Sequence, residues 1–130
     1  MTTAYDMMGG EQGVRALVTR FYELMDSLPE ARACRAIHPT DLTGSAEKLF
    51  EYLTGWLGGP PIFVEKRGPP MLRRRHLHLA IAGPEIDGWL LCFLRAWDDI
   101  VGDNPELAAL VLPQIHQLAR HMRNREDAVT

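Results

Sequence analysis

Hydrophobic residues recur along most of this chain at steps of three and four, the spacing that places them on one face of an α-helix. The first run predicts a helix over residues 14–28, with apolar positions at Val14, Leu17, Val18, Phe21, Met25 and Leu28. A short second helix over residues 29–37 begins with Pro29, a residue suited to a first helical turn. We expect it to end at His38, because a residue that precedes proline avoids the helical conformation.

A third helix is predicted around residues 49–57, with apolar positions at Leu49, Phe50, Leu53, Trp56 and Leu57. The sequence GGPP at residues 58–61 ends it. Residues 58–70 contain four prolines and three glycines, so we expect a long loop there. Loops of this length are often functional. A short helix over residues 71–77 is expected to follow the loop.

Two long helices are predicted in the second half of the chain. The first begins at Pro84, and its apolar stripe is Ile86, Trp89, Leu90, Phe93, Trp97, Ile100 and Val101. Asn104 is suited to cap the second and Pro105 to be its first residue. This last stripe is Leu107, Leu110, Val111, Ile115, Leu118 and Met122, and Pro113 inside it predicts a kink or a break. Since no segment alternates as a strand does, the sequence predicts an all-α fold in one domain, residues 1–130.

Composition and charge narrow the class of protein. A net charge of −3 gives no general attraction to nucleic acid or anionic lipid. No apolar run reaches the roughly 18–20 residues that span a membrane, and the first residues lack the features of a signal peptide. Cys34 and Cys92 are too few for a disulfide framework and form no CxxC pair. We therefore expect a cytoplasmic protein in which both cysteines are buried.

The sequence RRRHLH at residues 73–78 concentrates basic and imidazole groups in a slightly acidic chain. His76 and His78 would diverge by about 200° on a helix, so they do not form a paired zinc site. Each histidine can be structural or exposed to solvent, and the arginines can form a solvated basic turn. Alternatively, one imidazole is the single axial ligand of an iron macrocycle above an apolar pocket, with arginines at the rim for its carboxylates.

Tyr22 and Trp89 lie on the apolar faces of their helices and carry polar groups that need partners when buried. Both can be core aromatics. In a pocket, however, the phenol and the indole N–H could donate hydrogen bonds to a bound diatomic ligand. His38 could add a third donor, or it could instead satisfy carbonyl groups at the end of its helix.

The order and spacing of several fragments resemble those of group II truncated haemoglobins, small bacterial and plant globins with a two-over-two helical sandwich that encloses haem. The resemblance extends from Tyr5 to Glu126. The fragments are GG at 9–10, RFYELMDSLPE at 20–30, IHPTDL at 37–42, EKLFEYLTGWLGGPP at 47–61, MLRRRH at 71–76, DGWLLCF at 87–93 and HMRNRED at 121–127.

The resemblance implies a role for each matched residue. It implies that His76 is the proximal ligand of the iron in haem b, and that Lys48, Arg75 and Arg73 reach the haem propionates. The other residues that it places around the haem are Leu49, Phe63, Leu72, Trp89 and Phe93. On the distal side, where a diatomic ligand would bind, it places Tyr22, His38, Ser45, Leu49 and Trp89.

Three departures from the family pattern concern the haem rim. Many relatives read GHP where this chain has Gly68, Pro69 and Pro70, so a histidine near the propionates is missing. Phe63 stands where a tyrosine is often found, which removes a hydroxyl from the same rim. His78 and Leu79 replace a PF pair that follows the proximal histidine in many members.

As a function, the resemblance implies reversible binding of dioxygen and other diatomic ligands. Two distal hydrogen bonds, each worth roughly 1.5–3 kcal/mol, would slow oxygen release by about two to four powers of ten. Such release suits oxygen or nitric oxide chemistry, scavenging or redox protection better than bulk transport. The alternatives are a haem peroxidase-like enzyme, a nitric oxide dioxygenase, a gas sensor, and an all-α interaction module without a cofactor. We expect a separate reductase and a monomer or weak homodimer.

Overall fold

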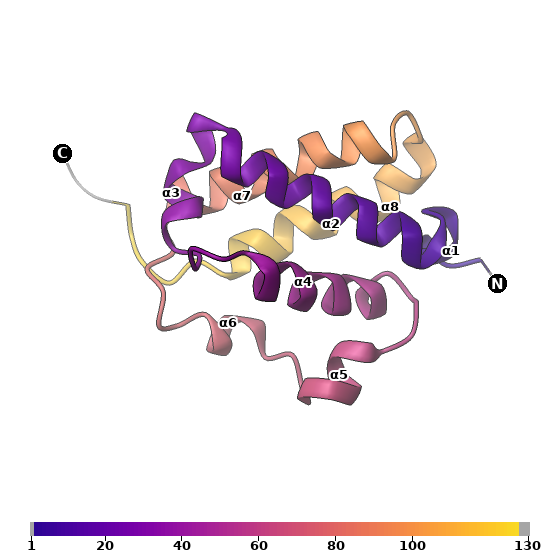
Figure 1. Cartoon of the computed structure of the whole chain (residues 1–130), viewed down its shortest axis with the longest axis horizontal. Coiled ribbons are helices and arrows are strands. Elements are labelled where there is room, and N and C mark those ends of the chain that lie inside the picture. The colour runs from indigo at the N-terminus through magenta and orange to yellow at the C-terminus, as the bar shows by residue number, and fades with distance from the viewer. Residues whose placement is uncertain (1, 128–130) are drawn as a thin grey trace.

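The computed structural model describes residues 2–127, which form helices and no strand (Figure 1). The prediction of an all-α fold is therefore confirmed. The helices are α1 Ala4–Met7, α2 Gly10–Ser27, the 3₁₀ turn η1 Pro29–Ala31, α3 Arg32–Ala36, α4 Thr43–Trp56, α5 Ile62–Arg67, α6 Leu72–Arg75, α7 Gly83–Ile100 and α8 Pro105–His121. None of the described helices is both long and apolar enough to cross a membrane.

The four long helices form two pairs, α2 with α4 and α7 with α8. Helix α2 packs against both α4 and α7, so it joins the two pairs. Figure 1 shows α2 running across the molecule between α7 and α4. The apolar stripes predicted from the sequence meet in one core, except that Ile100 and Leu110 are exposed rather than buried. Its largest fully buried members include Trp97, Phe21, Phe93, Leu17, Met25, Leu53, Leu107 and Ile115.

The middle of the chain differs from the prediction. Helix α4 begins at Thr43 rather than near residue 49, and the carboxylate of Asp41 accepts a hydrogen bond from the Thr43 N–H (2.9 Å) at this end. The expected loop over residues 58–70 contains α5, whose Phe63 is buried. The expected helix over 71–77 is shorter, because α6 ends at Arg75. These short elements depend on tertiary contacts, which periodicity does not report.

Pro113 predicted either a kink or a break in the last helix. Helix α8 is continuous through Pro113, so there is no break, and the kink stays a prediction. The helix buries apolar residues on both sides of the proline, Leu107 and Val111 before it and Ile115 and Ala119 after it. Packing of the two halves against one core thus keeps them in a single helix despite the lost backbone hydrogen bond. Asn104 caps the helix as predicted, because its side chain accepts from the Leu107 N–H at 3.1 Å.

Candidate functional site

His76 follows directly after α6 and is half-buried. Its Nδ1 lies 2.7 Å from the carbonyl oxygen of Leu72, so Nδ1–H donates to that carbonyl. The proton is thereby placed on Nδ1, and Nε2 keeps a lone pair for a metal. His78 is exposed, and no cluster of three or more His, Cys, Asp or Glu side chains suited to a metal is found among the described residues. The arrangement fits one axial imidazole and not a multi-residue metal site.

His38, just beyond α3, is oriented in the same way. Its Nδ1 lies 2.8 Å from the carbonyl oxygen of Cys34. Burial lowers the pKa of His38 below its ordinary value, and the positive charge of Arg35 lowers it further. Neutral His38 therefore presents Nε2 as an acceptor, which differs from the donor role expected from the sequence.

Tyr22 on α2 is buried, with its ring 6.0 Å from that of His38. Burial holds the pKa of its phenol far above the ordinary value, so the hydroxyl is a donor at any physiological pH. Its hydroxyl makes no hydrogen bond to another described residue. In residues 2–127, every side-chain nitrogen or oxygen that is fully shielded from solvent has a hydrogen-bond partner, so the Tyr22 hydroxyl is not fully shielded. The hydroxyl therefore reaches space that a small molecule can enter.

Trp89 on α7 is half-buried, and its ring stacks on Phe93 (5.4 Å between centres, 13° between planes). The edge of Phe21 contacts it as well, at 5.2 Å. The preceding residue, Gly88, allows this part of α7 to approach α3, because a Cβ there would lie 3.1 Å from Cβ of Cys34. Phe93 itself is 1% exposed, so it lies behind Trp89 in the core. Trp89 is thus the more accessible of the two aromatic side chains.

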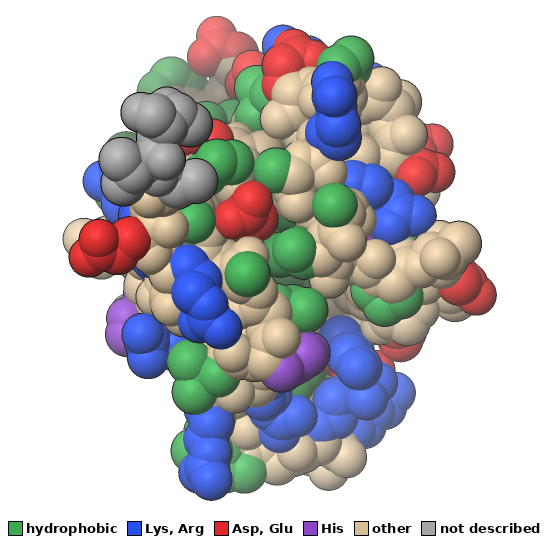
Figure 2. Space-filling view, turned by 90° about the vertical axis from the view of Figure 1, so that its left-hand side faces the viewer, with side chains coloured by type: hydrophobic (Ala, Val, Ile, Leu, Met, Phe, Trp, Pro, Cys, Tyr) green, Lys and Arg blue, Asp and Glu red, His purple; other side chains and the backbone are tan. Residues whose placement is uncertain are grey.

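The cations predicted for the haem rim are exposed, and they differ in the hydrogen bonds and ion pairs that they form. Arg75 donates from Nη2 to the carbonyl oxygens of Arg67 (2.9 Å) and Pro69 (3.0 Å). Arg73 donates to the carbonyl oxygen of Arg123 at 3.3 Å. Lys48 forms no ion pair with any described carboxylate. Figure 2 shows Lys and Arg side chains gathered on the lower part of one face, on the side where Figure 1 places α6.

The remaining predicted residues lie on α4, α5 and α6, and all but Phe63 are partly covered. Ser45 and Leu49 are half-buried on α4, and Leu72 is half-buried on α6. Phe63 on α5 is 6% exposed and lies beneath the guanidinium of Arg75, 5.3 Å from its carbon to the ring centre. The intermediate burial of Ser45, Leu49 and Leu72 fits the wall of an open pocket better than an enclosed core.

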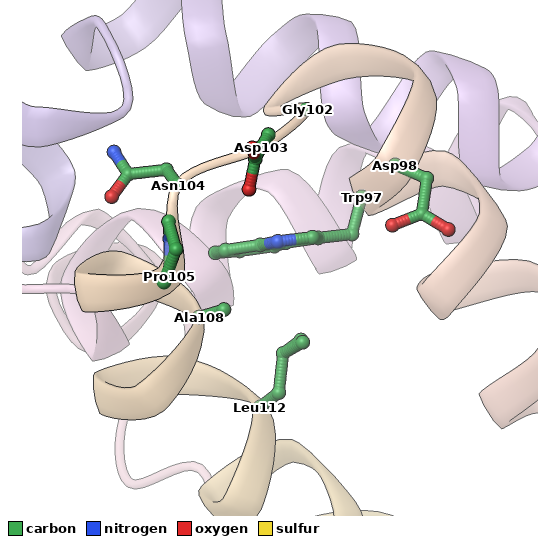
Figure 3. Close-up of a pocket in the computed structure, with 8 residues that line it drawn as sticks. All are labelled: Trp97, Asp98, Gly102, Asp103, Asn104, Pro105, Ala108 and Leu112. Carbon is green, nitrogen blue, oxygen red and sulfur yellow. The ribbon is translucent and has the colours of Figure 1, made fainter.

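A separate cleft of about 500 Å³ lies between the end of α7 and the start of α8 (Figure 3). In it the indole of Trp97 lies between Asp103 on one side and Ala108 and Leu112 on the other. No histidine or cation lines this cleft, and none of the residues predicted for the site belongs to it. Trp97 is 2% exposed, which identifies it as a core aromatic.

Two residues that the sequence did not single out connect the segment around His76 to the rest of the fold. Glu51 on α4 is 1% exposed and forms ion pairs with Arg67 (2.7 Å) and Lys66 (3.4 Å), and the Arg67 guanidinium holds its pKa below the ordinary value. Asn124 donates to the carbonyl oxygen of His76 at 3.2 Å. The sequence pattern did not predict this role for Glu51, because charged residues are common on an amphipathic helix. Asn124 was noted only as part of the family fragment HMRNRED.

The donor set suits haem: one imidazole with a free Nε2, two unpartnered donors on other helices, and cations on one face. Comparison with known proteins agrees with this class. The family model for bacterial-like globins matches residues 3–124, so the chain belongs to the bacterial-like globin family. Proteins of this family bind haem and, through it, diatomic gases such as oxygen.

Within this family the relatives are group II truncated haemoglobins. A group 2 truncated haemoglobin of Bacillus subtilis, YjbI, is 40% identical over 92% of this chain and 87% of its own. The structure of the group II 2-on-2 haemoglobin of Agrobacterium tumefaciens is 54% identical, with a TM-score of 0.93 over 98% of this chain and 97% of that one. A truncated oxygen-avid haemoglobin of Bacillus subtilis matches with 37% identity and a TM-score of 0.86, over 95% and 100%. The predicted family and two-over-two fold are confirmed.

Proposed function

We propose that this protein holds haem b through His76 and binds dioxygen and other diatomic ligands reversibly, for oxygen or nitric oxide chemistry rather than bulk transport. One observation carries the proposal. The hydrogen bond of His76 Nδ1 to the Leu72 carbonyl fixes the tautomer in which Nε2 can ligate iron. Haem, when bound, supplies the iron centre that binds the gas and changes oxidation state.

The protein's part on the proximal side is to orient one imidazole and to attract the propionates. The Leu72 carbonyl fixes the orientation of the His76 ring. Because this carbonyl accepts the hydrogen bond from Nδ1–H, the imidazole becomes a stronger electron-pair donor to a metal. Lys48, Arg75 and Arg73 are the cations proposed for the propionates. Because all three are exposed, each contact is worth about 1 kcal/mol or less.

On the distal side, Tyr22, Trp89 and His38 provide different hydrogen-bonding capacities. The Trp89 indole is a donor only, and the Tyr22 hydroxyl donates as long as it keeps its proton. Neutral His38 has Nε2 as an acceptor. Because Tyr22 has a single O–H, its hydroxyl donates either to His38 or to the ligand, and it adds to the Trp89 donor only when it is turned to the ligand. Two donors near a polarised ligand slow its release, and this supports the same oxygen avidity that names the Bacillus subtilis relative.

The experiment that tests this function compares two histidine variants. His76→Ala should abolish stoichiometric retention of haem, or the normal spectrum of the reduced ligand-free protein. His78→Ala is the matched control, since His78 is an exposed imidazole two residues away. Visible spectra of both purified proteins, with and without added haemin, give the readout. Loss in His78→Ala but not in His76→Ala would show that the ligand is assigned to the wrong residue.

We also propose a cytoplasmic location, reduction by a separate electron donor, and a monomer or weak homodimer. Both cysteines are free and buried, which agrees with a reducing compartment. The exposed large apolar side chains, Val64, Met71, Leu77, Ile100 and Leu110, are distributed over α5, α7, α8 and the α6 region. Scattered apolar residues of this kind do not form the continuous surface of a large obligate interface.

A further inference from the structure

The segment that carries His76 is only weakly held by hydrophobic packing. Helix α6 has four residues, none of them buried, and makes at most slight contact with any other described helix. Its entry is strained, because Met71 adopts a left-handed conformation (φ 40°) that is unfavourable for a residue other than glycine. Strained backbone persists only where surrounding contacts determine it. Polar contacts must therefore determine where α6 lies.

The first of these contacts starts at Glu51 on α4. Its carboxylate, 1% exposed, accepts from Arg67 Nε at 2.7 Å and from Lys66 Nζ at 3.4 Å. The carbonyl oxygen of Arg67 in turn accepts from Arg75 Nη2 at 2.9 Å, and Arg75 immediately precedes His76. We call this series of contacts the Glu51 bridge. It connects the helix that carries Lys48 and Leu49 to the segment that carries the proximal histidine.

The second contact comes from the C-terminal segment and acts on His76 itself. Asn124 donates from Nδ2 to the His76 carbonyl oxygen (3.2 Å), and its Oδ1 accepts from the Ile81 N–H (2.9 Å). The backbone N–H of Asn124 also donates to the Ile81 carbonyl oxygen, at 2.9 Å. This Asn124 bridge fixes both ends of the connection between α6 and α7.

We propose that Glu51 and Asn124 are positioning residues for the proximal histidine, and that the two bridges determine the orientation of its imidazole toward the iron. The proposal rests on the proposed function, because it concerns how His76 is held for haem. Glu51 acts through Arg67 and Arg75, whereas Asn124 acts on the His76 backbone directly. Neither residue touches haem or its ligand in this role.

Three variants test the proposal in the holoprotein. Glu51→Gln removes the buried charge, and its amide NH₂ would face the cations that the carboxylate now accepts from. Asn124→Asp keeps the acceptor for Ile81 but places a carboxylate oxygen against the His76 carbonyl, where a donor is needed. Asp99→Asn is the control for loss of an ion pair away from His76, since Asp99 and Arg20 form a more exposed pair of the same 2.7 Å length that joins α2 to α7.

Two readouts distinguish positioning from general stability. Resonance Raman spectroscopy of the reduced ligand-free protein reports the stretching frequency of the bond between iron and histidine. Hydrogen exchange reports local opening of the amides of residues 72–79. We expect Glu51→Gln and Asn124→Asp each to shift or broaden the iron–histidine band and to speed exchange in 72–79 about threefold to tenfold. Asp99→Asn should leave both unchanged.

The result that overturns the proposal is an unchanged band and unchanged local exchange in both bridge variants. A change of equal size in Asp99→Asn would also overturn it, because the effect would then be one of overall stability. Failure of the proposed function is seen separately, as normal haem retention in His76→Ala. The exchange measurement does not require haem, so it reports on the bridges even in that case.

Discussion

At the scale of single residues, we expect the proposed distal donors to determine how fast a ligand leaves. The Trp89 indole is half-buried, and its N–H has no partner among the described residues. Trp89→Phe keeps most of the bulk and the stack on Phe93 but removes the donor. One hydrogen bond to a polarised acceptor is worth roughly 1.5–3 kcal/mol, so the oxygen off-rate should rise about ten- to a hundredfold. Stopped-flow displacement of oxygen by carbon monoxide measures this rate.

The matched control for this variant is Trp56→Phe, which alters a half-buried tryptophan at the end of α4. It should leave the off-rate unchanged. If Trp89→Phe also leaves it unchanged, the indole only forms part of the pocket wall, and Trp89 is a core aromatic.

His38 gives the site a pH dependence whose sign follows from its surroundings. Burial, and then the charge of Arg35, lowers its pKa below the ordinary value of 6.5. The ring is therefore neutral at pH 7 and above, and Nε2 accepts. As pH falls through the lowered pKa, Nε2 gains a proton and becomes an additional donor near the ligand. We expect an off-rate that is constant from pH 7 upward and falls only below pH 6.5.

Stopped-flow rates measured across this pH range in the wild type and in His38→Phe provide the check. The variant should show no such fall, because phenylalanine has no titrating group. A transition centred at or above 6.5 in the wild type would contradict a buried, neutral His38.

At the scale of elements, periodicity predicted the long helices well and the short ones poorly. The stripes of α2, α7 and α8 bury one face against a common core, so their sequences record the fold directly. Helix α5 was missed because its four neighbouring prolines dominate the local signal, while its stability comes partly from Glu51 on another helix. The resemblance supplied His76, but Asn124 meets Ile81 across 43 positions of sequence, a contact that no local pattern encodes.

Two helical glycines illustrate how packing changes the effect of the same substitution. A Cβ at Gly88 would lie 3.1 Å from Cys34 Cβ and 3.2 Å from the Cα of Ala31, both tighter than ordinary contacts. A Cβ at Gly44 would meet nothing within 4 Å. Alanine gains up to about 1 kcal/mol over glycine in a helix, whereas overpacking against backbone costs about 1–3 kcal/mol. Gly44→Ala should therefore raise the free energy of unfolding, and Gly88→Ala should lower it.

Urea unfolding of both variants, compared with the wild type, measures this difference. Because Gly88 precedes Trp89, Gly88→Ala should also alter the oxygen off-rate. Equal stabilisation by both substitutions would mean that α7 does not approach α3 as closely as described.

At the scale of the whole molecule, the fold leaves apolar side chains only half covered on several facing elements. Leu49 on α4, Leu79 after α6 and Trp89 on α7 all pack against the core without being enclosed by it. Lys48 on α4 and Arg73 and Arg75 on α6 are exposed cations, and Figure 2 shows Lys and Arg side chains on the lower part of one face. An apolar macrocycle with carboxylate tails would cover the first group and pair with the second, which explains why both occur in one small chain.

This arrangement predicts that haem and folding are thermodynamically linked. A ligand that binds only the folded chain stabilises it by RT ln(1 + [L]/Kd), or about 2.7 kcal/mol when free ligand exceeds Kd a hundredfold. Adding haemin to the haem-free protein should therefore raise the midpoint of thermal unfolding. His76→Ala should show a much smaller rise, because the iron then lacks its protein ligand while the apolar contacts remain. Thermal melts followed by circular dichroism, at several haemin concentrations, measure both. An absent rise in the wild type would favour a cofactor-free helical module, and an equal rise in His76→Ala would mean that His76 does not ligate the iron.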